Sequence, residues 1–158
     1  MSPNAELRAL FKSMRRIARA VELHSRRLDR ELGMTLSQHV VLACVRDLGE
    51  VTSRAISAEA DVSPATMVGI LDKLEAKGLI ERYRSTRDRR IVHTKITAKG
   101  QAALARAPSP LGARFEAGFL RLDADSRAQT VAAFERVAHL AGIPEPGEVD
   151  EAAGRGRP

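Results

Sequence analysis

Two helix starts lie close together in residues 52–78, and no other feature restricts the fold of this chain as strongly. In "VTSRAISAEADVS", Thr52 or Ser53 can cap a short helix through its side-chain oxygen. After the tight turn "ADVS", Ser63 caps a second helix, and Pro64 takes its first position, where a missing N–H costs no hydrogen bond. The segment therefore predicts a helix-turn-helix.

The second of these helices has one apolar face and one open face. Gly78 ends the helix, and the apolar residues before it recur at steps of three and four, the period of a buried helix face. The inner face consists of Met67, Ile70, Leu71 and Leu74. The outer face then carries small residues first and basic residues later, namely Ala65, Thr66, Gly69, Lys73 and Lys77.

Two short runs with strand-like alternation follow, "LIERYR" and "IVHTKIT", around the tip "STRDRR". Residues 79–99 hold seven basic residues against two acidic ones, a local net charge of +5. Such a high density of positive charge at a hairpin tip indicates either a solvated surface or a contact with an anionic partner. Because the hairpin follows a helix-turn-helix, we interpret it as a wing and its charge as a DNA contact.

Helical segments flank this region. Residues 5–32 contain no Pro and no Gly, and their apolar residues form a heptad-like stripe. This stripe indicates contact with a second chain, although an intramolecular core is the alternative. Further on, Pro108 and Pro110 interrupt a helical segment because neither can donate to a helix ladder. The sequence predicts a mainly α fold with a small β wing.

The composition narrows the class of protein. Hydrophobic residues make up 44% of the 158 residues, enough for a packed core, and the net charge of +6 favours anionic partners. The lone cysteine, Cys44, provides neither a disulfide framework nor a metal cluster. The N-terminus lacks the apolar core of a signal peptide, and no stretch is apolar enough to span a membrane. We expect a soluble cytoplasmic protein with no metal, no cofactor and no membrane partner.

In a winged helix-turn-helix, the second helix lies in the DNA major groove and its N-terminal residues reach the base edges. The small residues Ala65 and Thr66 let this helix approach closely, and their methyl groups can touch a thymine methyl. Lys73 and Lys77 are placed for phosphates, and the free N–H groups at the helix N-terminus add to phosphate binding.

With these segments the chain resembles the MarR family of bacterial winged-helix regulators. The resemblance rests on "LSQHVVLACV", on "SPATMVGILDKLEAKGLIER" and above all on "RDRRIVHTKITAKG", which is similar to the D-R-R…L-T-x-x-G wing signature of that family. It implies a homodimer, usually a repressor, that binds a near-palindromic operator. Small aromatic acids release many members of the family from DNA, and cysteine oxidation releases some. Two features depart from the pattern: "KIT" replaces Leu-Thr, and "PSP" falls where many members have one long helix.

The resemblance also implies roles for the wing arginines. Arg90 is expected to insert into the minor groove, where the negative potential attracts arginine, and Asp88 to hold its guanidinium. Arg84, Arg87 and Arg89 are expected to meet phosphates. The predicted DNA-binding residues are Ser53, Ser63, Ala65, Thr66, Gly69, Lys73, Lys77, Arg84, Arg87, Asp88, Arg89 and Arg90.

The same resemblance divides the chain into an N-terminal dimerisation helix (1–34), a DNA-binding domain (35–98), C-terminal dimerisation helices (99–142) and a disordered tail (143–158). Predicted dimer contacts are Leu7, Leu10, Phe11, Met14, Ile17, Phe134 and Val137. An effector pocket for a small aromatic acid or another small molecule is expected between the helices and the DNA-binding lobe, with Arg15, Met34, His39 and Val40 as candidate lining.

Other functions fit the sequence less well. If the chain were a winged-helix module that binds a protein and no DNA, its recognition face would be uncharged or hydrophobic. The basic wing argues against this alternative. An enzyme is disfavoured because no nucleophile–base arrangement, phosphate loop or metal motif is present. Cys44 has no second cysteine to resolve a disulfide, so an inert thiol is favoured over a redox sensor.

Overall fold

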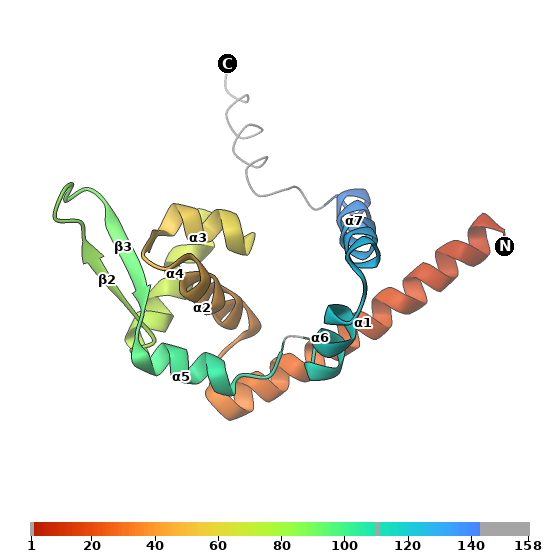
Figure 1. Cartoon of the computed structure of the whole chain (residues 1–158), viewed down its shortest axis with the longest axis horizontal. Coiled ribbons are helices and arrows are strands. Elements are labelled where there is room, and N and C mark those ends of the chain that lie inside the picture. Colours follow the sequence, from red (N-terminus) through yellow and green to blue (C-terminus); the bar gives the residue numbers. More distant parts are fainter. Residues whose placement is uncertain (1, 110, 143–158) are drawn as a thin grey trace, which may run out of the picture. The chain divides into compact units, whose positions relative to one another are not determined.

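The computed structural model describes residues 2–109 and 111–142 of the chain (Figure 1). Its elements in order are α1 (Pro3–Leu32), α2 (Leu36–Leu48), β1 (Val51–Thr52), α3 (Ser53–Ala60), α4 (Pro64–Ala76), β2 (Ile80–Arg84), β3 (Val92–Ile96), α5 (Ala98–Arg106), α6 (Ala113–Leu120) and α7 (Ala124–Leu140). The predicted mainly α fold with a small β wing is therefore confirmed.

The described residues form two compact units. One comprises α1 and the segment that contains α6, and the other comprises α2 to α5 together with α7. The predicted disorder of residues 143–158 lies outside the described residues, and so does Pro110.

In the first unit, α1 is a single helix of 30 residues, as the absence of Pro and Gly between residues 5 and 32 predicts. Gly33 ends the helix in the left-handed conformation (φ 60°), where its N–H donates to the Asp29 carbonyl over 2.7 Å. Leu28 is the buried residue of α1, whereas its N-terminal apolar stripe is open to solvent in the isolated chain.

The break after α5 separates it from α6, as Pro108 predicts. Gly112 begins α6 with φ 88°, a conformation that glycine adopts without strain. A Cβ atom at this position would lie 2.6 Å from His24 Nε2, so Gly112 also permits close packing of α6 on α1.

The core of the second unit consists mainly of aliphatic side chains from α2, α3, α4 and α5 and from the sheet. The predicted inner face of α4 is confirmed, because all four of its residues are buried. The residues packed around this face that are fully or almost fully buried are Val41, Leu42, Val45, Ile56, Ile80 and Thr94. This core fixes α3 and α4 as a helix-turn-helix, with Asp61 in the left-handed conformation (φ 50°) at the turn.

The sheet has three antiparallel strands in the order β1-β3-β2. The predicted hairpin is confirmed: β2 pairs with β3 in a register that places Ile80 opposite Ile96 and Arg84 opposite Val92. Strand β1 was not predicted, because two residues are too few to show an alternating pattern. In Figure 1 the hairpin tip lies at the end of the strands opposite α5.

Candidate nucleic-acid interface

The N-terminus of α4 is held by the cap that the sequence predicts. Ser63 Oγ accepts a hydrogen bond from the Thr66 N–H over 3.3 Å and donates one to Thr66 Oγ1 over 3.0 Å. Because the Thr66 hydroxyl accepts from Ser63, its own hydrogen can point outward to an acceptor on a partner. The cap thus orients a side chain at the predicted base-reading position.

The outward face of α4 contains the residues that the helical period places there, and one more. Ala65, Thr66, Gly69 and Lys73 are exposed, as predicted. Val68 lies on the same face with 53% of its surface exposed, although sequence reasoning omitted it. Its position three residues after Ala65 and one before Gly69 was the available signal.

An arginine on the first wing strand joins the hairpin to α4. Arg82 Nε donates to Glu75 Oε2 over 2.8 Å, Arg82 Nη2 donates to Asp72 Oδ1 over 2.6 Å, and the Arg82 backbone N–H donates to Glu75 Oε1. The hydrogen bonds from Arg82 hold the pKa of Glu75 below its usual value. Sequence reasoning counted Arg82 as wing charge only. Asp72 and Glu75, two acidic residues about one helical turn apart, were the signal in the sequence for this contact.

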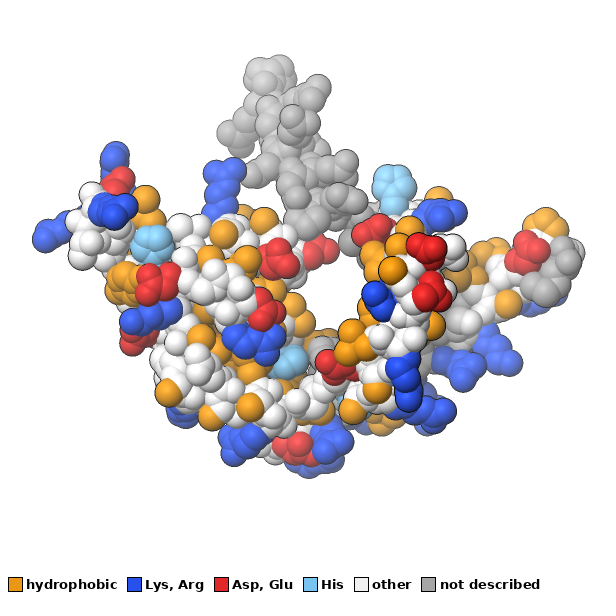
Figure 2. All heavy atoms as spheres, viewed as in Figure 1, with side chains coloured by type: hydrophobic (Ala, Val, Ile, Leu, Met, Phe, Trp, Pro, Cys, Tyr) orange, Lys and Arg blue, Asp and Glu red, His pale blue; other side chains and the backbone are white. Residues whose placement is uncertain are grey.

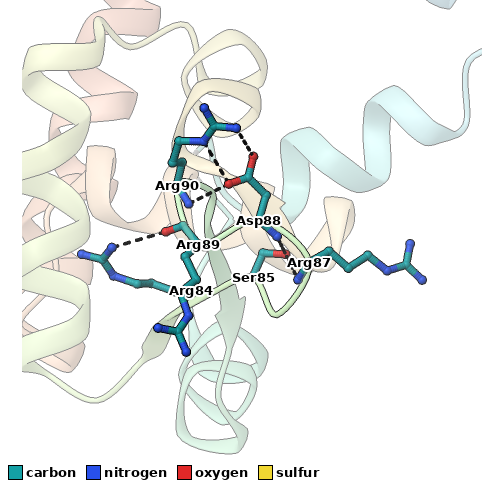
Figure 3. Close-up of polar contacts among 6 residues, drawn as sticks. All are labelled: Arg84, Ser85, Arg87, Asp88, Arg89 and Arg90. Carbon is teal, nitrogen blue, oxygen red and sulfur yellow. Dashed lines mark hydrogen bonds and ion pairs between the residues drawn. The ribbon is translucent and has the colours of Figure 1, made fainter.

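The wing tip is a tightly hydrogen-bonded turn (Figure 3). The Ser85 N–H donates to the Ile91 carbonyl, and the N–H groups of Arg87 and Asp88 converge on Ser85 Oγ. Asp88 in turn accepts three bonds from Arg90: from its N–H at 3.0 Å, from Nε at 3.1 Å and from Nη2 at 3.2 Å. These bonds lower the pKa of Asp88.

This turn presents a cation in a fixed position. The Arg90 side chain is 91% exposed although its guanidinium is paired with Asp88. Arg84 Nη1 donates to the Arg89 carbonyl over 3.3 Å, while the side chains of Arg87 and Arg89 extend away from the turn in Figure 3. Figure 2 shows Lys and Arg side chains gathered on the hairpin tip at the upper left. The paired Asp88–Arg90 contact expected from the resemblance is therefore present.

Hydrogen bonds from residues 96–100 ("ITAKG") hold the base of the wing against the C-terminal end of α4. Thr97 Oγ1 donates to the Gly78 carbonyl and accepts from the Gly100 N–H, at 2.7 and 3.0 Å. Lys99 Nζ donates to the Lys77 carbonyl at the C-terminus of α4, over 2.7 Å. A Cβ atom on Gly100 would lie 2.1 Å from the Leu79 carbonyl oxygen, so this position requires glycine.

Comparison with known proteins agrees with this arrangement. Residues 34–92, which run from two residues before α2 to the first residue of β3, match the model of the MarR family. From the residues before α2 to the start of β3, the chain is therefore similar to the MarR family. The family consists of transcriptional regulators rather than enzymes.

Two curated relatives come from Bacillus subtilis. The HTH-type transcriptional regulator YsmB is 27% identical over 57% of this chain, and the HTH-type transcriptional repressor MdtR is 34% identical over 43% of it. The chain spans less than two thirds of either relative, 62% of YsmB and 44% of MdtR.

Among solved structures, a mutant of Escherichia coli MarR in complex with operator DNA has the same fold. It has a TM-score of 0.63 and 23% identity, covering 87% of this chain and 99% of that one.

Two predicted DNA contacts, Ser53 and Lys77, are half-buried in the fold. Ser53 is the first residue of α3 and half-buried, and the cap of α3 is Thr52, whose Oγ1 accepts from the Ala55 N–H. Lys77 lies at the C-cap of α4, where Nζ donates to Gln38 Oε1 over 2.9 Å. Phosphate contact by either residue stays a prediction.

The predicted effector residues differ in accessibility. Arg15 is exposed on α1, Val40 is half-buried on α2, and Met34 is completely buried, so its side chain meets a ligand only after a rearrangement. His39 is buried, and burial together with the nearby charge of Arg46 lowers the pKa of its imidazole. Effector binding by these residues stays a prediction.

The predicted dimer contacts are accessible in the single chain. Leu7, Leu10, Phe11, Met14 and Ile17 form a stripe on α1 whose members are 36–51% exposed. On α7, Phe134 is 54% exposed and Val137 is half-buried. Figure 2 shows hydrophobic and basic side chains along α1 toward its N-terminus, at the right.

Residues 2–109 and 111–142 contain no group of three or more His, Cys, Asp or Glu side chains that could hold a metal ion. None of the described helices is long and apolar enough to cross a membrane. Cys44 is half-buried, and burial, followed by the charges of Glu59 and Asp47, raises the pKa of its thiol, which disfavours the reactive thiolate.

Proposed function

We propose that the chain is a homodimeric, sequence-specific DNA-binding regulator that represses transcription from a near-palindromic operator. Helix α4 reads the major groove, and the wing, residues 85–90, enters the minor groove. The observation that carries this proposal is the exposed Arg90 guanidinium, fixed by Asp88 at the tip of a hairpin behind a helix-turn-helix.

The Asp88–Arg90 pair supports minor-groove binding in two ways. A guanidinium that is already oriented loses less side-chain entropy when it binds than a free arginine does. The pair also neutralises Asp88, which would otherwise repel the phosphates that border the groove. Arg90 retains Nη1 for acceptors on the minor-groove edge, since only Nε and Nη2 are used by Asp88.

The exposed stripe on α1 supports a homodimer. Five large apolar side chains on one face of a helix are a surface that usually meets another chain. A two-fold dimer would place two copies of α4 about 34 Å apart, which corresponds to half-sites one turn of DNA apart. Phe134 and Val137 on α7 are proposed as further dimer contacts.

The relative MdtR, which is named a repressor, supports repression. The complex of MarR with operator DNA supports operator binding. A protein that covers an operator overlapping a promoter blocks polymerase by occupancy alone. We further propose that a small aromatic acid or a similar molecule lowers DNA affinity, and that Arg15, exposed on α1, offers a cation for its carboxylate.

The competing function is a winged-helix module that binds a protein partner. Five basic residues, Arg84, Arg87, Arg89, Arg90 and Lys73, are exposed on the wing and α4, which favours a polyanion. A salt titration separates the two functions. If six to ten phosphates are neutralised per dimer, DNA affinity should fall about 10³–10⁵-fold between 50 and 200 mM salt.

The direct test is selection of bound fragments from a random DNA pool, followed by affinity measurements with Arg90→Ala and the control Arg121→Ala. Each variant removes one exposed arginine, but Arg121 lies after α6, away from the wing in sequence. Arg90→Ala should weaken binding at least tenfold without changing the thermal midpoint or the dimer mass. A pool without a symmetric enriched site, or equal affinities of both variants, would refute the proposal.

A further inference from the structure

The N-terminal half of the outward face of α4 carries no charge. Ala65, Thr66, Val68 and Gly69 are all exposed there, and Val68 is the largest side chain among them. Charged residues appear only in the following turn, where Asp72 is paired with Arg82 over 2.6 Å and Lys73 is exposed. The part of α4 that reaches base edges is therefore small and mostly apolar.

Such a surface selects one kind of base chemistry. Thr66 supplies the only side-chain hydroxyl among the four residues, and the others offer methyl groups or open backbone. The thymine C5-methyl is the apolar group that the major groove displays, whereas guanine is read by a bidentate arginine or lysine. Val68 and Ala65 thus match thymine, and this half of the face holds no guanine-reading side chain.

Gly69 is the second observation, because nothing within the described fold requires glycine there. It lies within α4, and a Cβ atom added to it would meet no heavy atom within 4 Å. Glycine in a helix interior is less favourable than alanine. The hollow that it leaves beside Val68 lets a partner approach the helix backbone closely.

We propose that Val68 is a specificity-determining residue, which packs against a thymine 5-methyl group in each half-site while Gly69 lets the helix sit deep in the groove. This inference rests on the proposed DNA-binding function. The exposed arginines of the wing make duplex DNA, rather than an apolar protein segment, the occupant of this face.

The test uses an operator found by selection, in which single thymines are replaced by deoxyuridine. The two bases share their hydrogen-bonding edges and charge and differ only by the methyl group. Affinities of the wild-type protein and of Val68→Ala are measured on both DNAs. A thymine outside the half-sites, replaced in the same way, serves as the control position.

For one thymine in each half-site, the wild-type protein should lose about fourfold in affinity per methyl group removed. Val68→Ala should lose a similar factor on the thymine operator and should be insensitive to the uracil substitution. Because Val68 is half-exposed, this variant should unfold at the wild-type temperature.

Two results overturn the inference while leaving the proposed function intact. Specific binding that tolerates uracil at every half-site thymine would exclude methyl recognition. An equal uracil penalty in Val68→Ala and in the wild-type protein would assign the methyl contact to another residue. Failure of the proposed function would instead appear as the absence of any selected site.

Discussion

The substitution Gly69→Ala separates the requirements of the fold from those of DNA binding. The added Cβ has open space around it in the described structure, so its effect on the folded chain is the gain in helix propensity alone. Alanine is more favourable than glycine in a helix interior by about 1 kcal/mol. For a chain of this size that gain raises the thermal midpoint by about 2–4 °C.

On DNA the same methyl group should be harmful. If the helix backbone approaches the bases at Gly69, an additional carbon forces the helix outward, and overpacking of this kind costs about 1–3 kcal/mol. DNA affinity should therefore fall about tenfold or more in a variant that is more stable than the wild-type protein. Thermal unfolding by circular dichroism and fluorescence anisotropy with labelled operator measure the two effects.

The matched control is Gly118→Ala on α6, where an added Cβ likewise meets no atom within 4 Å. The thermal midpoint of this variant should rise, as in Gly69→Ala, and its DNA affinity should equal that of the wild-type protein. Unchanged DNA affinity in a stabilised Gly69→Ala protein would refute the idea that the backbone at residue 69 approaches DNA.

Three further substitutions test other contacts. Arg82→Gln removes the partly exposed ion pairs to Asp72 and Glu75 and should cost about 1 kcal/mol in denaturant unfolding, less at high salt; a loss that is independent of salt would contradict the ionic role. Gly100→Ala places a carbon 2.1 Å from a backbone oxygen and should destabilise by about 3 kcal/mol or more, so a wild-type melting curve would show that the Leu79 carbonyl is not held there. The pKa of His39 is lowered in the folded state, so the unfolded chain binds more protons, and the free energy of unfolding should fall as the pH drops below the ordinary histidine pKa. His39→Gln should flatten the slope of unfolding free energy against pH in that window. An unchanged slope would assign the pH dependence to other groups.

Local chemistry in the sequence was enough to predict most helices and the hairpin. Ser63 and Pro64 define the start of α4 because a cap and a proline act within one turn of the chain. The spacing of Met67, Ile70 and Leu71 predicts its buried face because helical period depends on sequence alone. Asp88 and Arg90 are only two residues apart, so their contact is also local.

Contacts between residues distant in sequence were decided only by the tertiary structure. Which acids Arg82 contacts and whether Lys77 reaches Gln38 both depend on how the elements pack. The two residues of β1 form a strand only because β3 offers them backbone partners. The helical period places Val68 on the outward face of α4, but packing decided that no other element of the described fold covers it, because an apolar side chain is buried wherever a neighbouring element packs over it, and 53% of its surface stays exposed.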